Sequence, residues 1–145
     1  MRVRSLTKDH AIAGLRLGYV LASAELAGRL EARRAPWMTN AVAEAAGIAA
    51  VRAKLFVEES RALLRVDRDE LCAGLKEMGL VPFATSSYFL TFAVPDSGAL
   101  RRRLLAKAIL VRDCASFGMP GYVRVSARSR PDRERLLQAL REELA

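Results

Sequence analysis

The sequence has few of the residues from which metal sites and disulfide frameworks are built. Its 145 residues include one histidine, His10, and two cysteines, Cys72 and Cys114, without CxxC spacing. One histidine without ligand partners nearby does not make a zinc site, so we expect no bound metal. Two isolated cysteines are typical of reduced, partly buried thiols in a cytoplasmic protein.

Long apolar runs are also missing. No window approaches the 18 or so uncharged apolar residues that a membrane-spanning helix needs, so we expect no membrane segment. Residues 1–8 turn polar at once and lack the apolar core of a signal peptide. Apolar residues still make up 52% of the chain, and its length fits one ordinary domain, so it can bury a core.

Basic residues outnumber acidic ones, 24 to 16, which gives a formal net charge of +8. Nucleic acid is the usual partner of a basic chain. Here, however, the arginines are dispersed, the run Arg101-Arg102-Arg103 falls within an apolar-periodic helix pattern, and no aromatic stacking residues are interleaved with them. We therefore interpret the charge as solvated helix faces and expect no nucleic-acid partner.

The apolar pattern predicts an α/β layout in which a small sheet is covered by helices. Ser23 and either Thr39 or Asn40 are placed to cap helices, and Gly79 is placed to end one. The apolar run 17–22 is predicted to be a buried strand. Strands are expected at 3–6, 17–22, 81–83, 88–94, 109–111 and 122–126, and helices at 23–34, 41–78, 99–108 and from Pro131 to the C-terminus.

Three regions differ in character. Residues 1–40 have two short strands that do not belong obviously to the later sheet. Residues 41–78 are helical, and their first half is apolar on all sides, which predicts burial on most sides. Residues 79–145 form the small α/β domain, with leucines at core spacing in the last helix. We therefore divide the chain into 1–40, 41–78 and 79–145.

One segment carries residues suited to an aldehyde cofactor with a phosphate. Lys8, in a short turn after a strand, can form an imine. The hydroxyls of Ser5 and Thr7 precede it, and Arg16, eight residues later, has the planar fork that binds phosphate. On these residues alone, a solvated lysine in a turn remains the alternative.

The segment SLTK (5–8) through AGLRLGY (13–19) resembles the cofactor-lysine segment of the class I/II aminotransferases, and is most similar to histidinol-phosphate aminotransferases and threonine-phosphate decarboxylases. The resemblance implies pyridoxal 5'-phosphate (PLP) as cofactor. It places the Schiff-base lysine at Lys8, where it also moves a proton at the substrate α-carbon. It implies that Ser5 and Arg16 hold the cofactor phosphate and that Thr7 also belongs to the cofactor-binding residues.

Four further segments, PWMTNAVA (36–43), SYFL (87–90), ILVRDCASF (109–117) and GYVRVS (121–126), resemble later parts of the same family. In the last of them the family arginine grips the substrate carboxylate or another acidic group, and Arg124 matches it. The implied fold is the C-terminal domain of a fold-type I PLP enzyme, together with the last strands and lysine turn of the large PLP domain.

The resemblance implies an aminotransferase that acts on amino acids and keto acids, or on an amino-phosphate substrate, and that forms a homodimer. Ser87, often Asn in the family, and Met38-Thr39 depart from the usual pattern, while residues 112–117 are slightly closer to the threonine-phosphate decarboxylases of cobalamin biosynthesis. Transamination, decarboxylation and a non-catalytic remnant or subunit therefore stay open.

Most of the family's cofactor domain would precede the lysine, and the sequence begins just before it. We therefore expect a fragment that is inactive alone. Its first strands should have open edges, its apolar helix should lie uncovered, and its first forty residues should be loosely held.

Overall fold

A computed structural model describes residues 1–83 and 85–144. The chain forms two compact units, Met1–Ser60 and Arg61–Ala145, which are described separately. The sequence division at 40 and 78 stays a prediction, because the two units do not test it.

The first unit opens with a two-stranded antiparallel hairpin of β1 (Arg2–Ser5) and β2 (Gly18–Leu21), in which Ser5 pairs with Gly18. Both strands were predicted. The predicted burial of 17–22 is wrong, because all four residues of β2 are exposed. The run is apolar, but it lies in a hairpin of two strands, and Tyr19, Val20 and Leu21 are 45–53% exposed.

Two capped helices follow in the same unit. Ser23 accepts from the backbone of Leu26 and caps α1 (Ala24–Glu31), which ends before the predicted residue 34. Asn40 Oδ1 accepts from the backbone N–H of Ala43 at 2.8 Å and caps α2 (Ala41–Arg52). These two side chains supply acceptors for backbone donors that a helix leaves without partners.

The prediction that the apolar helix α2 is buried on most sides is wrong. Only Ala43 and Ala50 are buried in it, whereas Val42, Ile48 and Val51 are exposed. A helix buries apolar residues only where another element lies against them, so α2 presents most of its apolar surface to solvent. The exposure of these side chains agrees with the expectation that this apolar helix lies uncovered.

The single helix predicted over 41–78 is interrupted at one residue. Ala53, with φ −83° and ψ 48°, leaves helical geometry, and α3 (Lys54–Glu77) begins after it. No glycine or proline marks this break in the sequence, so composition could not reveal it. At the other end, Gly79 with φ 75° follows α3, as its placement predicts.

The second unit contains a three-stranded antiparallel sheet in the order β3-β5-β4, with β3 (Phe89–Ala93), β4 (Arg112–Asp113) and β5 (Tyr122–Ser126). The predicted strands at 88–94 and 122–126 are confirmed. The strand at 109–111 is wrong, because pairing with β5 begins only at Arg112. The strand at 81–83 is also wrong, although the backbone N–H of Phe83 donates to Thr91 O.

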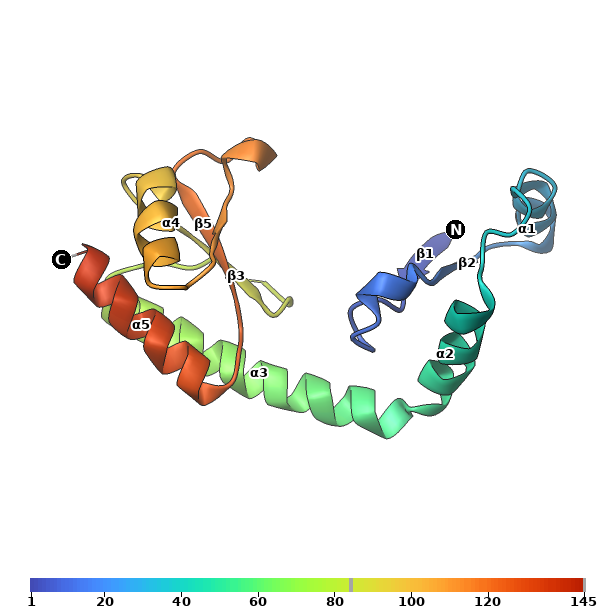
Figure 1. Ribbon diagram of the computed structural model, residues 1–145, viewed down its shortest axis with the longest axis horizontal. Helices are drawn as coiled ribbons and strands as arrows, with labels where there is room; N and C mark the ends of the chain where they lie inside the picture. Colours follow the sequence, from blue (N-terminus) through green and yellow to red (C-terminus); the bar gives the residue numbers. More distant parts are fainter. Residues whose placement is uncertain (84, 145) are drawn as a thin grey trace. The chain divides into compact units, whose positions relative to one another are not determined.

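One face of this sheet forms the core. Leu90, Phe92, Val123 and Val125 alternate along β3 and β5 with less buried residues. Helices α4 (Ser97–Ala106), α5 (Arg130–Leu144) and the second half of α3 supply the rest of the core and lie around the sheet (Figure 1). The buried helical leucines are Leu71, Leu75, Leu100, Leu104, Leu136, Leu137 and Leu140.

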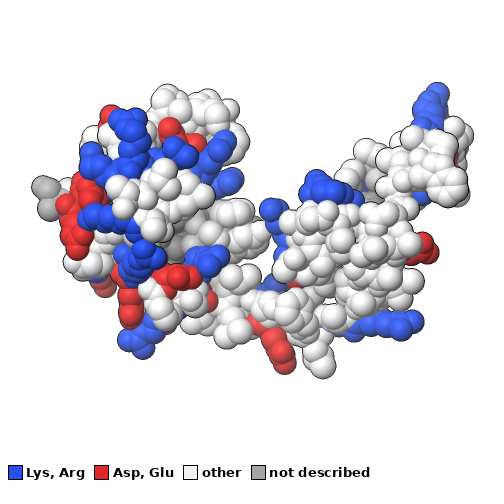
Figure 2. Space-filling model, viewed as in Figure 1, with Lys and Arg blue, Asp and Glu red and all other residues white. Residues whose placement is uncertain are grey.

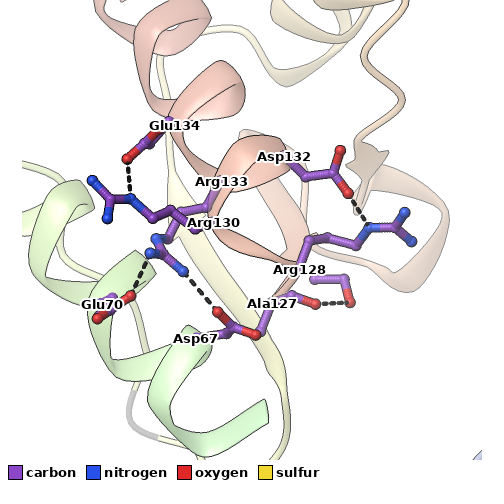
Figure 3. A network of polar contacts seen from close by, with 9 residues as sticks. Asp67, Glu70, Ala127, Arg128, Arg130, Asp132, Arg133 and Glu134 are labelled. Atoms are coloured by element: carbon purple, nitrogen blue, oxygen red, sulfur yellow. Dashed lines mark hydrogen bonds and ion pairs between the residues drawn. The ribbon is translucent and has the colours of Figure 1, made fainter. Parts of the chain in front are cut away.

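Helices α3 and α5 are joined by close packing and by a buried cation. A Cβ added at Gly74 would lie 2.5 Å from Leu137 Cδ1, so glycine allows the close approach of the two helices. Arg133, only 8% exposed, reaches from α5 to Asp67 at 2.8 Å and to Glu70, both on α3 (Figure 3).

Candidate functional site

The predicted cofactor lysine lies in a turn directly after β1. Lys8 is exposed, its backbone carbonyl accepts from Ala11 N at 3.2 Å, and Leu6 O accepts from His10 N at 3.3 Å. Thr7 is buried, and its hydroxyl lies 2.7 Å from Ser5 Oγ. The turn therefore leaves the lysine amine in solvent and fixes the two hydroxyls against each other.

Arg16 lies at the same end of the hairpin. It stands two residues before Gly18, the register partner of Ser5, and has a left-handed backbone with φ 54°. Its guanidinium donates to Ala13 O at 3.1 Å. The structure thus brings Ser5, Thr7, Lys8 and Arg16 to one end of the β1–β2 hairpin.

Gly18 and Gly47 allow close contacts that hold this end. A Cβ at Gly18 would lie 2.6 Å from Arg4 O in β1, and one at Gly47 of α2 would lie 2.6 Å from Leu17 Cδ2. Leu17 therefore packs on α2, and its backbone carbonyl accepts from Leu6 N at 3.1 Å. Helix α2 supports the strand entry beside Arg16.

The other predicted site residue, Arg124, belongs to the second unit, at the centre of β5. It lies on the sheet face opposite the core, where Thr91 of β3 and Arg112 of β4 are its register partners. Its guanidinium carbon lies 4.4 Å from the ring centroid of Phe89 and 5.5 Å from that of Phe117.

Arg112 was not predicted as a site residue. It lies opposite Arg124, its guanidinium carbon is 4.7 Å from the Phe117 ring centroid, and it donates to Ser116 Oγ at 2.8 Å. The sequence did not indicate Arg112 because its role follows from the pairing of β4 with β5. The strand was predicted at 109–111, which left Arg112 outside it.

A cavity of about 650 Å³ in the second unit contains both arginines in its lining. Arg101, Arg128 and Arg135 also line it, and Asp132 is the carboxylate among its described lining residues. Asp132 accepts from Arg128 at 3.0 Å. The lining therefore carries a clear excess of positive charge, which favours an anionic ligand.

Elsewhere in this unit, the basic residues are interleaved with acidic ones, as Figure 2 shows for one face. Lys107 contacts Glu142 at 2.6 Å and Glu143 at 2.8 Å. Hydrogen bonds from Lys107 hold the pKa values of both carboxyls below their usual range, and the same bonds raise the pKa of Lys107. These charges lie at helix surfaces, which agrees with the interpretation of the basic charge as helix faces.

The described residues contain neither a membrane-spanning helix nor a metal-binding cluster. No described helix is long and apolar enough to cross a membrane. Within residues 1–83 and 85–144, no group of three or more His, Cys, Asp or Glu side chains could hold a metal ion. Cys72 and Cys114 are free thiols, the first partly buried and the second buried.

Comparison with known proteins identifies relatives over nearly the whole chain. Histidinol-phosphate aminotransferase 1 of Dechloromonas aromatica is 36% identical over 97% of this chain and 39% of its own length. Threonine-phosphate decarboxylase of Salmonella typhimurium is 37% identical over 98% of this chain and 40% of its own length. The chain thus spans about two fifths of the length of these curated relatives.

The fold has matches of the same kind. The solved histidinol-phosphate aminotransferase from Clostridium acetobutylicum superimposes with a TM-score of 0.89 and 26% identity, covering 97% of this chain and 44% of that one. The predicted fold, part of a fold-type I PLP enzyme, is confirmed. The model of the family "Aminotransferase class I and II" matches residues 1–141. The chain therefore belongs to the class I and II aminotransferase family.

Proposed function

We propose that this chain supplies the cofactor lysine, the phosphate ligands and the substrate arginines of a PLP-dependent aminotransferase. The observation that carries the proposal is the end of the β1–β2 hairpin, where an exposed Lys8 lies in the same turn region as Ser5, Thr7 and Arg16. An amine, two hydroxyls and a guanidinium are the groups that an aldehyde with a phosphate requires. Family membership supports the same assignment.

Lys8 is the covalent and proton-carrying residue of this proposal. PLP, when bound, supplies an electron sink for the bonds of the substrate α-carbon. Lys8 holds the cofactor through its amine before substrate arrives, and then moves a proton at the α-carbon. Its position in an exposed turn leaves the side chain accessible to a cofactor.

Ser5 and Arg16 bind the phosphate, and Thr7 supports them. Arg16 donates through its planar guanidinium, and Ser5 donates through its hydroxyl. Thr7 is buried, and its hydroxyl contacts Ser5 at 2.7 Å, so its geometry favours an effect exerted through Ser5. The carbonyl of Ala13, which accepts from Arg16, orients the guanidinium.

Arg124 binds an acidic group of the substrate, and Arg112 assists it from the neighbouring strand. A bidentate pair between guanidinium and carboxylate or phosphate would fix the substrate orientation. The relatives named above favour an amino acid or amino-phosphate substrate of the histidinol-phosphate type, with a keto acid as the second substrate. The complete enzyme would be a cytoplasmic homodimer.

The test is to mix the purified chain with PLP, reduce it with borohydride and map the modified lysine by mass spectrometry. The other lysines of the sequence, Lys54, Lys76 and Lys107, are internal controls. We expect selective labelling of Lys8 by PLP, weaker labelling by pyridoxal, which lacks the phosphate, and loss of this preference in Arg16→Ala. Equal labelling of all four lysines would overturn the proposed cofactor site.

Decarboxylation is the second candidate activity. The Salmonella typhimurium threonine-phosphate decarboxylase is as similar to this chain as the aminotransferases are. The two reactions differ in which bond of the α-carbon breaks. Carbon dioxide release from a phosphorylated amino acid, without consumption of a keto acid, would favour decarboxylation over transamination.

A non-catalytic role as one part of a two-chain enzyme is the third candidate. The uncovered apolar side chains of α2, and Trp37 at 97% exposure, favour it because such a surface suits a partner domain. We infer that the chain is inactive alone and requires the remainder of the cofactor site. Transaminase activity of the purified chain would contradict this inference.

A further inference from the structure

The positive charges of Arg112 and Arg124 repel each other, and this repulsion is unfavourable unless other groups offset it. They are direct register partners on adjacent antiparallel strands. Like charges in this position destabilise a sheet. Within the described part of the chain, neither guanidinium forms an ion pair with a carboxylate at 4.0 Å or less. Arg112 is exposed and Arg124 is half-buried, so solvent screens part of this repulsion, and neighbouring groups or a ligand can compensate the rest.

Aromatic rings are those neighbours. The Phe117 centroid lies 4.7 Å from the guanidinium carbon of Arg112 and 5.5 Å from that of Arg124, so one ring contacts both cations. Phe89 contacts Arg124 from β3 at 4.4 Å. A ring face attracts a cation without occupying the N–H groups through which a guanidinium binds an anion.

Phe117 is held in place although its side chain is 54% exposed. It ends the 3-10 turn η2 (Ala115–Phe117), and its N–H donates to Cys114 O at 2.9 Å. Cys114 is buried, and Gly118 closes the turn with φ 75°. A half-exposed phenyl ring contributes little to the core. Core packing therefore does not explain why a phenylalanine occupies this position in the turn.

We propose that Phe117 is a positioning residue that holds Arg112 and Arg124 ready to bind one doubly charged anionic group of the substrate. The inference rests on the proposed function of Arg124 as the substrate arginine. The ring draws two repelling cations to a common position, and the anion then neutralises both. A phosphate monoester carries about −1.5 to −2 charges near neutral pH, which matches two guanidiniums.

The test uses the full chain labelled with ¹⁵N-arginine and follows the Nε–Hε signals of Arg112 and Arg124 by NMR during titration with inorganic phosphate at constant ionic strength. We expect saturable shifts of both signals. Phe117→Leu should weaken phosphate binding about two- to five-fold, the size of an exposed cation–π contact. Phe117→Tyr, which keeps the ring face, should restore the wild-type affinity.

Phe83→Leu is the matched control. Phe83 is also half-exposed in this unit, but it stacks on Tyr122 at 5.3 Å between centroids. We expect it to leave phosphate binding unchanged. Thermal unfolding of each variant is measured alongside, and a Phe117→Leu effect that only follows a loss of folded protein would overturn the proposal.

The remaining outcomes separate the two claims. If Arg112→Ala and Arg124→Ala abolish binding while Phe117→Leu leaves it intact, the positioning role is wrong and the substrate arginines stand. If neither arginine variant changes the affinity, or if the wild-type chain shows no saturable shift, the substrate arginines fail and the role of Phe117 fails with them.

Discussion

Among single residues, Asp113 shows how a carboxylate outside the proposed substrate site can determine its geometry. Its Oδ1 accepts from the backbone N–H of Ala115 at 3.0 Å and from Ser97 Oγ at 2.9 Å. The bond from Ala115, followed by that from Ser97 and by the charges of Arg101 and Arg112, lowers the pKa of Asp113 below its ordinary 3.8. This carboxylate anchors the turn that carries Phe117 to the start of α4.

The lowered pKa has a definite sign for stability. A carboxyl whose pKa is depressed in the folded state stabilises it above the unfolded pKa, and this contribution is lost as the pH falls through the folded pKa. Thermal unfolding of the wild type and of Asp113→Asn, compared from about pH 5 to about pH 2, should show the steeper loss in the wild type. Parallel curves would mean that Asp113 is not coupled to folding.

The proposed site residues fall into two groups: those that are close together in the sequence, and those that only strand pairing brings together. Ser5, Lys8 and Arg16 lie at one end of a single hairpin, so the resemblance of one short segment was enough to single them out. Arg112 and Phe117 gain meaning only from the register of β4 on β5, which joins residues a dozen positions apart. The register of two strands cannot be deduced from the spacing of residues along the chain. The sequence therefore indicated Arg124 but not its neighbours Arg112 and Phe117.

At the scale of elements, the contact between α3 and α5 depends on one buried cation. Arg133 is 8% exposed and bridges Asp67 and Glu70 (Figure 3). Removing one partner of such a buried group leaves the others desolvated and unpaired. The carboxylates here are partly solvated, which moderates the expected cost.

Arg133→Met keeps the volume of the side chain and removes both ion pairs. We expect it to lower the free energy of unfolding of the second unit by about 1–3 kcal/mol, the usual cost of unmaking hydrogen bonds to charged groups. Urea denaturation followed by circular dichroism measures this. Arg130→Met, on the exposed pair with Glu134 in the same helix, is the control and should have a clearly smaller effect.

Strands were predicted correctly where the residues that enter the core also pair with a neighbouring strand. They were predicted wrongly where buried apolar residues lie outside the strand pairing. Tyr122–Ser126 alternates because Val123 and Val125 enter the core, and the strand was found with its correct bounds. Val111 is also buried, but as a core residue before the ladder starts, so its apolar run imitated a strand. The break at Ala53 has no breaker residue at all.

For the whole molecule, the two units differ in how much they bury. Of the described residues up to Ser60, only Thr7, Ala43 and Ala50 are buried, whereas the second unit has a continuous core that includes Phe92, 0% exposed. Stability follows apolar burial, so the first unit should open at a much lower free energy.

Limited proteolysis checks this difference. Trypsin should cleave the chain first within residues 1–40, where Arg29, Arg33 and Arg34 are exposed, and leave a resistant product that begins near Glu58. Mass spectrometry of a time course identifies the products. Equal resistance of residues 1–40 and of the second unit would show that the first unit is held more firmly than its burial suggests.

The hairpin of β1 and β2 has a consequence for the chain in solution. Among residues 1–83 and 85–144, each of these strands pairs on one side only, so its other edge presents backbone groups that another strand could join. Arg2 and Arg4 lie on β1, and the net charge of +8 keeps copies of the chain apart. Salt shortens the reach of that repulsion from about 30 Å at 0.01 M to about 10 Å at 0.1 M. The colloidal stability of this protein should therefore fall as salt is added, and light scattering should rise.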